Sequence, residues 1–397
     1  MWLNMAIELS GQYRFEFSMG PLQDFIFEGN LVRFEINEQT GNYLPDFELV
    51  FDTAEDRVAS IVNEGNDINV RLGKSTDDGL IDVKLVPANI SSNKVGDGLR
   101  RYEITGLRGN LPYINNTKVF TTTVKSGIEA LIEIGGRNFG VNNVDTNVTI
   151  STDSQRWIQP NITDKAFANN VWMHTDLGLT SYPAVAISVD GKFIIRDIRL
   201  LAAAKAKNPD FIFTDSPTNR RRAILYDGDY SLENESGFIN HWMGYGRIKN
   251  ILTMETGVEF QAFQEVTPHL SLLKNLVRRA ELEKKHASMG IINDNVHVNY
   301  WNAFLRNLQS CAIFSSYPVN LSFHNLFQPI RVLDICTFNE RDLEKKLISQ
   351  SFSGLYLVSK VNRVLEHRQL VTTVQLVREA INYPAGTFRS QEIAPLA

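Results

Sequence analysis

Several features that would point to a particular chemistry are scarce in this sequence of 397 residues. Its two cysteines, Cys311 and Cys336, lie outside any Cys-x-x-Cys or cysteine–histidine pattern, which argues against a metal site. No stretch approaches the ~18 apolar residues that a membrane-spanning helix needs. The first residues also lack the basic head and apolar run of a signal peptide. We therefore expect a protein made in a cytoplasm, with two buried thiols and no stable membrane insertion.

An excess of positive charge is missing too. The 40 Lys and Arg residues are outnumbered by 45 Asp and Glu residues, and the net charge of −5 disfavours wholesale binding of nucleic acid. The basic run from Arg220 to Arg222 could be a local phosphate patch. A solvated or salt-bridged turn is the simpler interpretation of it.

Catalytic motifs are equally sparse. The sequence has no Gly-x-Ser-x-Gly elbow, and no nucleophile can be nominated beside His174 and Asp176. No two histidines have the spacing of zinc ligands on a helix. The glycine-rich stretch 135–140 follows an expected helix, so a C-cap explains it better than a phosphate loop. We expect no catalytic residue, no metal and no cofactor, and hence no enzyme.

What is present is a strong strand pattern from residue 13 to about 109. Tyr13 to Met19 alternates apolar and polar residues, which predicts a half-buried strand. A short helix is expected at 54–63, with Thr53 as its cap. Further strands are expected at 31–36, 47–51, 68–72, 81–86 and 101–107. Such a region favours a compact antiparallel barrel or sandwich.

Residues 112 to about 210 have a mixed character. A helix is predicted from 126 to 134, ending at Gly135-Gly136, and a second helix after Thr163. Asp190-Gly191 between two β-rich runs is the strongest hairpin signal in the chain. Together these features predict a small α+β unit.

The remaining chain returns to extended runs interrupted by helices. One helix is expected from a Thr267 cap to Gly290, another at about 300–308, and His297 is expected in a strand. Strands are predicted at 211–213, 223–226, 246–253, 312–314, 319–323 and 332–336. A long hairpin, 353–379, follows them.

The hairpin carries a pattern of residues that can be compared with known families: Gly354, Tyr356, Val358, Thr372, Thr373, Leu376 and Arg378. This pattern resembles the terminal hairpin of the central hub proteins of contractile-tailed bacteriophage baseplates. The stretch TDSQRWIQPNITDKAFANNVWMHTDL, followed by a hairpin and the run Arg196 to Leu200, looks like the α+β insertion of such hubs. The order of these pieces over about residues 10–381 carries the resemblance.

The resemblance implies an α+β, mainly β fold with two tail-tube-like antiparallel β-barrel domains, an α+β insertion and a helical connection. The expected domains are a first barrel (1–110), the insertion (111–210), a mixed strand and helix connecting domain (211–311), a second barrel with the long hairpin (312–381) and a flexible tail (382–397).

The resemblance also implies a structural virion protein of the phage tail. A homotrimer with two barrels per chain would match a sixfold tail tube to a threefold central spike and enclose a channel for genome passage. The implied partners are the spike, the tube or its initiator, the baseplate wedge proteins and, transiently, DNA. Because this chain ends soon after the hairpin, the spike and any cell-wall-cleaving activity should belong to another chain.

The tip half of the hairpin is the expected subunit interface or channel lining. Its base is expected inside its own barrel, and hairpins of different subunits are expected to pair, which would cover exposed edges. Uninterrupted alternation would place Tyr356 and Val358 on the same face as Lys360. The predicted interface residues are Lys360, Val361, Asn362, Arg363, Gln369, Thr372 and Val374.

Two alternatives to the phage hub remain open. A carbohydrate-acting or receptor-binding β protein would use aromatic and acidic residues, here Trp157, Trp172, Trp242, Trp301, Asp227, Asp229 and Glu233. Core packing of the tryptophans and a turn at the acids explain the same residues. The hub of a phage-derived injection machine is the other alternative, and it differs little in physical terms.

Overall fold

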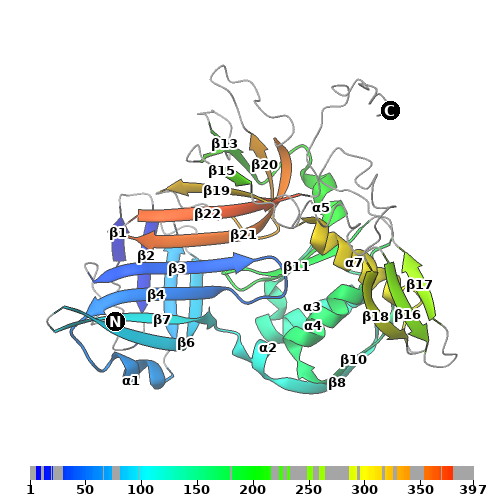
Figure 1. Cartoon of the computed structure of the whole chain (residues 1–397), viewed down its shortest axis with the longest axis horizontal. Coiled ribbons are helices and arrows are strands. Elements are labelled where there is room, and N and C mark those ends of the chain that lie inside the picture. Colours follow the sequence, from blue (N-terminus) through cyan, green and yellow to red (C-terminus); the bar gives the residue numbers. More distant parts are fainter. Residues whose placement is uncertain are drawn as a thin grey trace, which may run out of the picture.

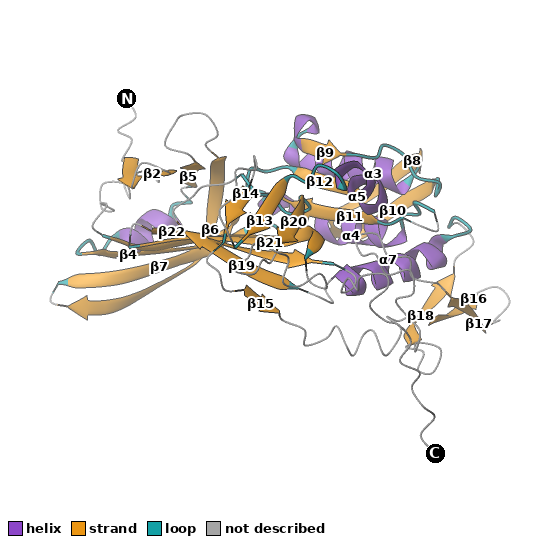
Figure 2. Ribbon diagram, turned by 90° about the horizontal axis from the view of Figure 1, so that it is seen from above, coloured by secondary structure: helices purple, strands orange, loops and turns teal. Residues whose placement is uncertain are grey.

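The computed structural model describes residues 6–9, 13–18, 20, 30–65, 67–73, 81–96, 98–178, 181–215, 223–226, 230–232, 248–253, 259–263, 286–292, 296–314, 318–324, 329–339, 353–367 and 369–378. Across these residues the protein is mainly β, as expected, and strands greatly outnumber helices (Figure 1). One sheet of 14 strands dominates the described part, beside three sheets of two or three strands. The end of the large sheet that holds β4 (Asp46–Thr53) and β7 (Leu99–Arg108) lies away from the helices α3 (Gly127–Phe139), α4 (Asp164–His174) and α7 (Tyr300–Phe314), which are at the opposite end of the molecule (Figure 2).

The first half of the large sheet confirms the predicted N-terminal strands. Its strands are β1 (Ala6–Leu9), β2 (Tyr13–Ser18), β3 (Leu31–Gln39), β4 (Asp46–Thr53), β5 (Ile68–Gly73), β6 (Ile81–Gly96) and β7 (Leu99–Arg108). They are ordered β1-β2-β5-β6-β7-β4-β3, and all neighbours are antiparallel. Phe47, Leu49 and Phe51 alternate into one core with Phe15 and Ile104.

The helix of this region, α1 (Val58–Asn63), begins later than predicted. Thr53 is the last residue of β4 and does not cap the helix. Its hydroxyl instead accepts a hydrogen bond from the backbone N–H of Glu55 at 3.2 Å, which shapes a turn between strand and helix. The cap position is Arg57, whose side chain makes no capping bond.

The insertion folds as an α+β unit around its own core. Its elements are α2 (Leu111–Asn115), β8 (Thr117–Lys125), α3 (Gly127–Phe139), the 3₁₀ helix η2 (Val141–Asn143), β9 (Val144–Thr146), β10 (Gln155–Thr163), α4 (Asp164–His174), β11 (Pro183–Ile187), β12 (Phe193–Asp197) and α5 (Ile198–Lys205). The Asp190-Gly191 hairpin is confirmed, because β11 and β12 pair antiparallel around it. Thr163 caps α4, as its hydroxyl accepts from the Ala166 N–H.

The end predicted for the first helix of the insertion is wrong. Gly135 and Gly136 lie inside α3, and the helix ends at Gly140, which has a φ of 94°. A Cβ at Gly135 would lie 2.6 Å from the ring of Phe193, so this glycine permits close packing of helix on strand. A capping box of Ser126 and Glu129 starts the helix.

The second half of the large sheet combines strands that are distant in the sequence. Its strands are β13 (Phe211–Thr214), β14 (Ala223–Leu225), β15 (Tyr230–Leu232), β19 (Val319–His324), β20 (Ile335–Asn339), β21 (Gly354–Glu366) and β22 (Gln369–Val377). β13 runs parallel to both β14 and β20, whereas β19, β21 and β22 are antiparallel neighbours. A second core lies under these strands and includes Phe213, Phe323 and Phe338.

Two further predictions, for residues 312–314 and for the residues just before Gly290, are wrong. Residues 312–314 belong to α7 (Tyr300–Phe314) and not to a strand, because a short apolar run fits either structure. The helix predicted up to Gly290 falls mostly outside the described residues, but its last residues form β18 (His286–Ile292). That strand pairs parallel with β16 (Ile248–Thr253), which in turn pairs with β17 (Glu259–Phe263), so sheet pairing outweighs the apparent cap signal.

Candidate functional site: the joint at the terminal hairpin

The terminal hairpin, β21 and β22, runs through the large sheet and connects its two halves (Figure 1). β21 pairs with β20 over its first residues and with β3 from Lys360 to Glu366. β22 lies along the other edge of β21, and β19 covers the outer edge of β22. These edges are therefore occupied within the chain. The expected edge-to-edge pairing of hairpins from different subunits is wrong for the described strands.

A β-bulge at Ser359 changes which side chains face the core. Val358 stands opposite Leu376, but Lys360 stands opposite Gln375, so β21 accommodates one extra residue. Such a bulge moves the following side chains to the other face. Tyr356 and Val358 are consequently buried while Lys360 is exposed. The uninterrupted alternation expected from the sequence is wrong at this point.

Four of the seven predicted interface residues lie on the buried face of the hairpin. Val361 stands opposite Val374, and Arg363 opposite Thr372. Each of these side chains is at most 2% exposed within the single chain. The structure thus brings them together as part of the core between the two halves, and their role at a subunit interface stays a prediction.

The other three predicted residues share the opposite face of the hairpin. Lys360 and Gln369 are exposed, and Asn362 is half-buried. The amide of Asn362 donates a hydrogen bond of 2.6 Å to Oε1 of Glu35 on β3. This face is open to a ligand or another molecule at Lys360 and Gln369.

A buried ion pair links the hairpin to the first half of the sheet. Nη1 of Arg363 lies 3.3 Å from Oε1 of Glu38 on β3, and both side chains are 2% exposed. The guanidinium also donates to the carbonyl of Ile330 at 2.6 Å, and Glu38 accepts from the N–H of Val189 at 2.9 Å. Burial raises the pKa of Glu38, and Arg363 acts against that rise. Because a buried charge is costly without its partner, this pair makes the halves depend on one another.

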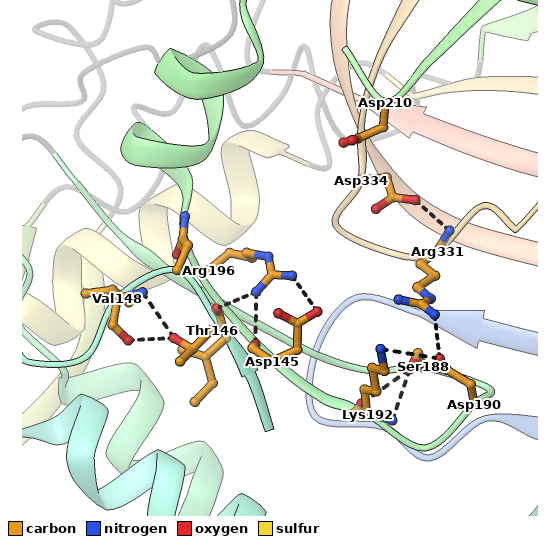
Figure 3. A network of polar contacts seen from close by, with 12 residues as sticks. Asp145, Thr146, Val148, Ser188, Asp190, Lys192, Arg196, Asp210, Arg331 and Asp334 are labelled. Atoms are coloured by element: carbon orange, nitrogen blue, oxygen red, sulfur yellow. Dashed lines mark hydrogen bonds and ion pairs between the residues drawn. The ribbon is translucent and has the colours of Figure 1, made fainter. Parts of the chain in front are cut away.

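The turn 188–192 of the insertion is held by both halves, and Figure 3 shows the contact from the second half, made by Arg331. Nε of Arg108, at the end of β7, donates to the carbonyl of Val189 at 3.0 Å. Arg331, from the loop before β20, donates to Oδ2 of Asp190 at 2.6 Å. Gly191 has a φ of 86°, and the Arg108 guanidinium fills the space where a Cβ would lie. We call the residues Glu38, Arg108, Val189, Asp190, Arg331 and Arg363 the joint.

Further acids lie beside the joint (Figure 3). Asp334 accepts a hydrogen bond of 2.8 Å from the N–H of Arg331. Burial raises the pKa of Asp334 to about 7 despite this bond, and the charge of Asp210 adds to the rise. Asp210 is itself held by Nζ of Lys205 at 2.5 Å and by the N–H of Ile335 at 3.2 Å. Asp334 can therefore exchange a proton near neutral pH, and its bond to Arg331 orders the loop before β20.

A second polar contact fixes α7 to the insertion. Arg306 pairs with Asp176 at 2.5 Å, and both are buried. Burial alone would raise the pKa of Asp176, but Arg306 holds it below its usual value. The buried amide of Asn307 donates to the carbonyls of Trp172 and Thr175 at 3.2 and 2.9 Å, which satisfies the C-terminal end of α4.

The residues considered for catalysis or metal binding do not form such a site in the described chain. His174 stacks on Tyr300 with 3.7 Å between ring centroids, and His297 lies in the turn before α7, where a strand was predicted. The described residues contain no group of three or more potential metal ligands. Trp157 and Trp172 are buried in the core of the insertion. The following lie outside the described residues: Arg220 to Arg222, Asp227, Asp229, Glu233 and Trp242.

Sequence reasoning missed most of the joint. Glu38 had a usable signal, since it stands in phase with Phe34 and Ile36 along β3 and so falls on the core face. A carboxylate at such a position requires a buried partner. Arg331 and Val189 carried no signal of this kind, because they lie in loops whose placement depends on tertiary contacts.

No protein-family model and no curated protein matches this sequence. Among the solved structures that match this chain are two phage tail proteins for which nearly the whole of both chains is covered. The tail protein from Neisseria meningitidis MC58 is 11% identical with a TM-score of 0.56, and 93% of this chain and 97% of that chain are covered. The 43 kDa tail protein of prophage MuSo2 from Shewanella oneidensis is 10% identical with a TM-score of 0.56, covering 93% and 99%. The chain has the fold of phage tail proteins. The resemblance drawn from the sequence is confirmed at the level of fold.

Within the described residues, no helix is both long and apolar enough to cross a membrane.

Proposed function

We propose that this protein is a trimeric hub of a contractile phage baseplate, a structural component that adapts a sixfold tail tube to a threefold spike. The observation that carries the proposal is a fold shared with two tail proteins over 93% of this chain and at least 97% of theirs. A likeness over nearly the whole of both chains favours a common architecture over one shared module.

The internal organisation of the chain supports this proposal. Two separate apolar cores lie under the two halves of one long sheet. If each half is one tube-like barrel, three chains supply six such units around an axis and three spike-facing surfaces. The ring encloses a channel through which DNA passes. The joint holds the two units of one chain in a fixed relation, which a symmetry adaptor requires.

The proposal includes the location and partners of the protein. It belongs to the virion, at the tail baseplate, and is assembled in the host cytoplasm. Its partners are the central spike, the tail tube or tube initiator and the surrounding wedge proteins. The role is structural and not enzymatic, so the chain contributes shape and contacts to the tail.

The proposal is tested by the mass of the purified protein and by its place in the particle. Light scattering should give three times the chain mass of 45.0 kDa. Antibody against the chain should label the baseplate end of purified tails in electron micrographs. A monomer at all concentrations that is also absent from tails would refute the proposal.

A further inference from the structure

A cavity of about 710 Å³ opens where several parts of the chain meet. Its walls are the segment 39–43, the α4 stretch 163–173, β11 with Tyr182 and both strands of the terminal hairpin, together with Cys311 of α7 and Leu333. Ligand sites in proteins have volumes of roughly 300–1,000 Å³, so this cavity is large enough for a small molecule. Its position beside the joint means that an occupant would touch the first half, the insertion and the hairpin at once.

The cavity wall combines apolar surface with positive charge. Trp172, Met173, Leu357 and Val377 are among the apolar residues that line the cavity. The charged residues among the described lining residues are two lysines, Lys165 and Lys360, with no aspartate or glutamate beside them. This local excess runs against the net charge of −5 of the whole chain.

The hairpin bulge places one lysine in the cavity. Leu357 and Val377 stand opposite one another on the cavity side, and the bulge at Ser359 turns Lys360 to the same side. Without the extra residue Lys360 would point into the core, where an unpaired ammonium is strongly disfavoured. The bulge therefore places the ammonium-bearing side chain of Lys360 on the same wall of the cavity as the apolar Leu357 and Val377.

The second lysine comes from α4. Nζ of Lys165 lies 4.8 Å from the centre of the Tyr43 ring, at the edge of the segment 39–43. The backbone carbonyl of Lys165 accepts from the amide of Asn42 at 2.6 Å, which ties this segment to the helix. Neither Lys165 nor Lys360 forms an ion pair with another described residue. Two cations that share a partly enclosed wall without an acid favour an anion between them.

We propose that this cavity binds a small ligand with an apolar body and one anionic group, such as an alkyl carboxylate. The body packs on Trp172, Met173 and Leu357, and the anion faces Lys165 and Lys360. This site is independent of the proposed hub function, because it lies within one chain.

The test is calorimetric titration of the full chain with sodium octanoate and, as an uncharged match, 1-octanol. We expect saturable binding of octanoate at least about fivefold tighter than octanol, since the anion adds interactions that the alcohol lacks. Replacing both lysines, Lys165→Gln with Lys360→Gln, should weaken octanoate about tenfold and leave octanol unchanged. Lys94→Gln, at the exposed end of β6, is the matched control and should have no effect.

A steric variant separates this cavity from other apolar surfaces. Ala166 is exposed and lines the cavity, so Ala166→Trp should fill it without disturbing the core and abolish binding of both probes. Circular dichroism of each variant confirms its fold. Equal affinities for octanoate and octanol, no saturable binding at millimolar octanoate, or equal losses in Lys94→Gln and the double-lysine variant would overturn the proposal.

Discussion

Each half of the large sheet covers an apolar core, but the two halves differ in strand pairing and in the parts of the chain that form the core. In the first half every neighbouring pair is antiparallel, and most of the core residues come from 15–104. In the second half β13 is parallel to two neighbours, and the core draws on residues 182–226 as well as 319–377. The first half is thus largely local in sequence, whereas the core of the second half combines residues of the insertion and of the terminal hairpin that are far apart in sequence.

The terminal hairpin contributes side chains to the cores of both halves, so variants in it report on how the two halves are coupled. Leu365 and Leu370, near its tip, join the first core together with Val189 from the insertion. Val358 and Val361, nearer its base, join the second core. Three variants in the joint or beside it test how far the two halves depend on one another, from the largest expected effect to the smallest.

Arg363→Met should have the largest effect. It leaves the Glu38 carboxylate buried without its partner, which costs about 3–5 kcal/mol of unfolding free energy. Urea denaturation measures this loss. Arg57→Met, which breaks an exposed pair with Glu55, is the control and should cost much less than Arg363→Met, because solvent screens an exposed pair. The double variant Glu38→Leu with Arg363→Met should recover much of the lost stability. A double variant as unstable as Arg363→Met alone would argue against a coupled pair.

Asp334→Asn should alter the pH dependence of stability. The folded pKa of about 7 exceeds the ordinary value of 3.8, so the folded chain binds a proton that the unfolded chain releases in this interval. Stability therefore falls as pH rises from about 4 to 7 and levels off above that. Because Asp334 is only partly buried, we expect a contribution of about 1–2 kcal/mol.

The comparison of wild type and Asp334→Asn isolates this one group from the other titrating acids. The two proteins should have similar midpoints of thermal unfolding at pH 4.5, and the variant should be more stable at pH 7.5. Parallel curves across the whole range would show that Asp334 does not take up the proton.

Gly191→Ala should have an effect no larger than that of Asp334→Asn. Alanine is strained at a φ of 86°, and its Cβ would displace the Arg108 guanidinium from the turn 188–192. We expect a loss of about 1–2 kcal/mol in chemical denaturation. Gly65→Ala is a matched control, since Gly65 has a φ of 79° but open space around it. Equal losses in both variants would mean that the contact with Arg108 contributes nothing.

The sequence predicted the elements better than their assembly. Strands such as Tyr13–Ser18 and the Asp190-Gly191 hairpin follow from local alternation and turn chemistry. The bulge at Ser359 left no local trace, because neither Ser359 nor its neighbours require it, and it reversed the expected faces of the hairpin. The pairing of β21 with β3 depends on partners more than 300 residues apart, which periodicity does not report.

The predicted interface residues show the same limit. The apolar members, Val361 and Val374, could be recognised as buried from their alternation with polar neighbours. Arg363 is in phase with Val361 and Leu365, so its place on the core face could be inferred, but its partner Glu38 on a distant strand could not. The domain boundaries drawn from the sequence stay predictions, and so does the assignment of these residues to a subunit contact.

The central claim is that three copies of this chain form one ring. Averaged end-on electron micrographs of the purified protein, taken without imposed symmetry, measure it most directly. The proposed hub predicts threefold symmetry with six similar β units around a central opening. Isolated single chains, or rings whose symmetry is not threefold, would contradict it.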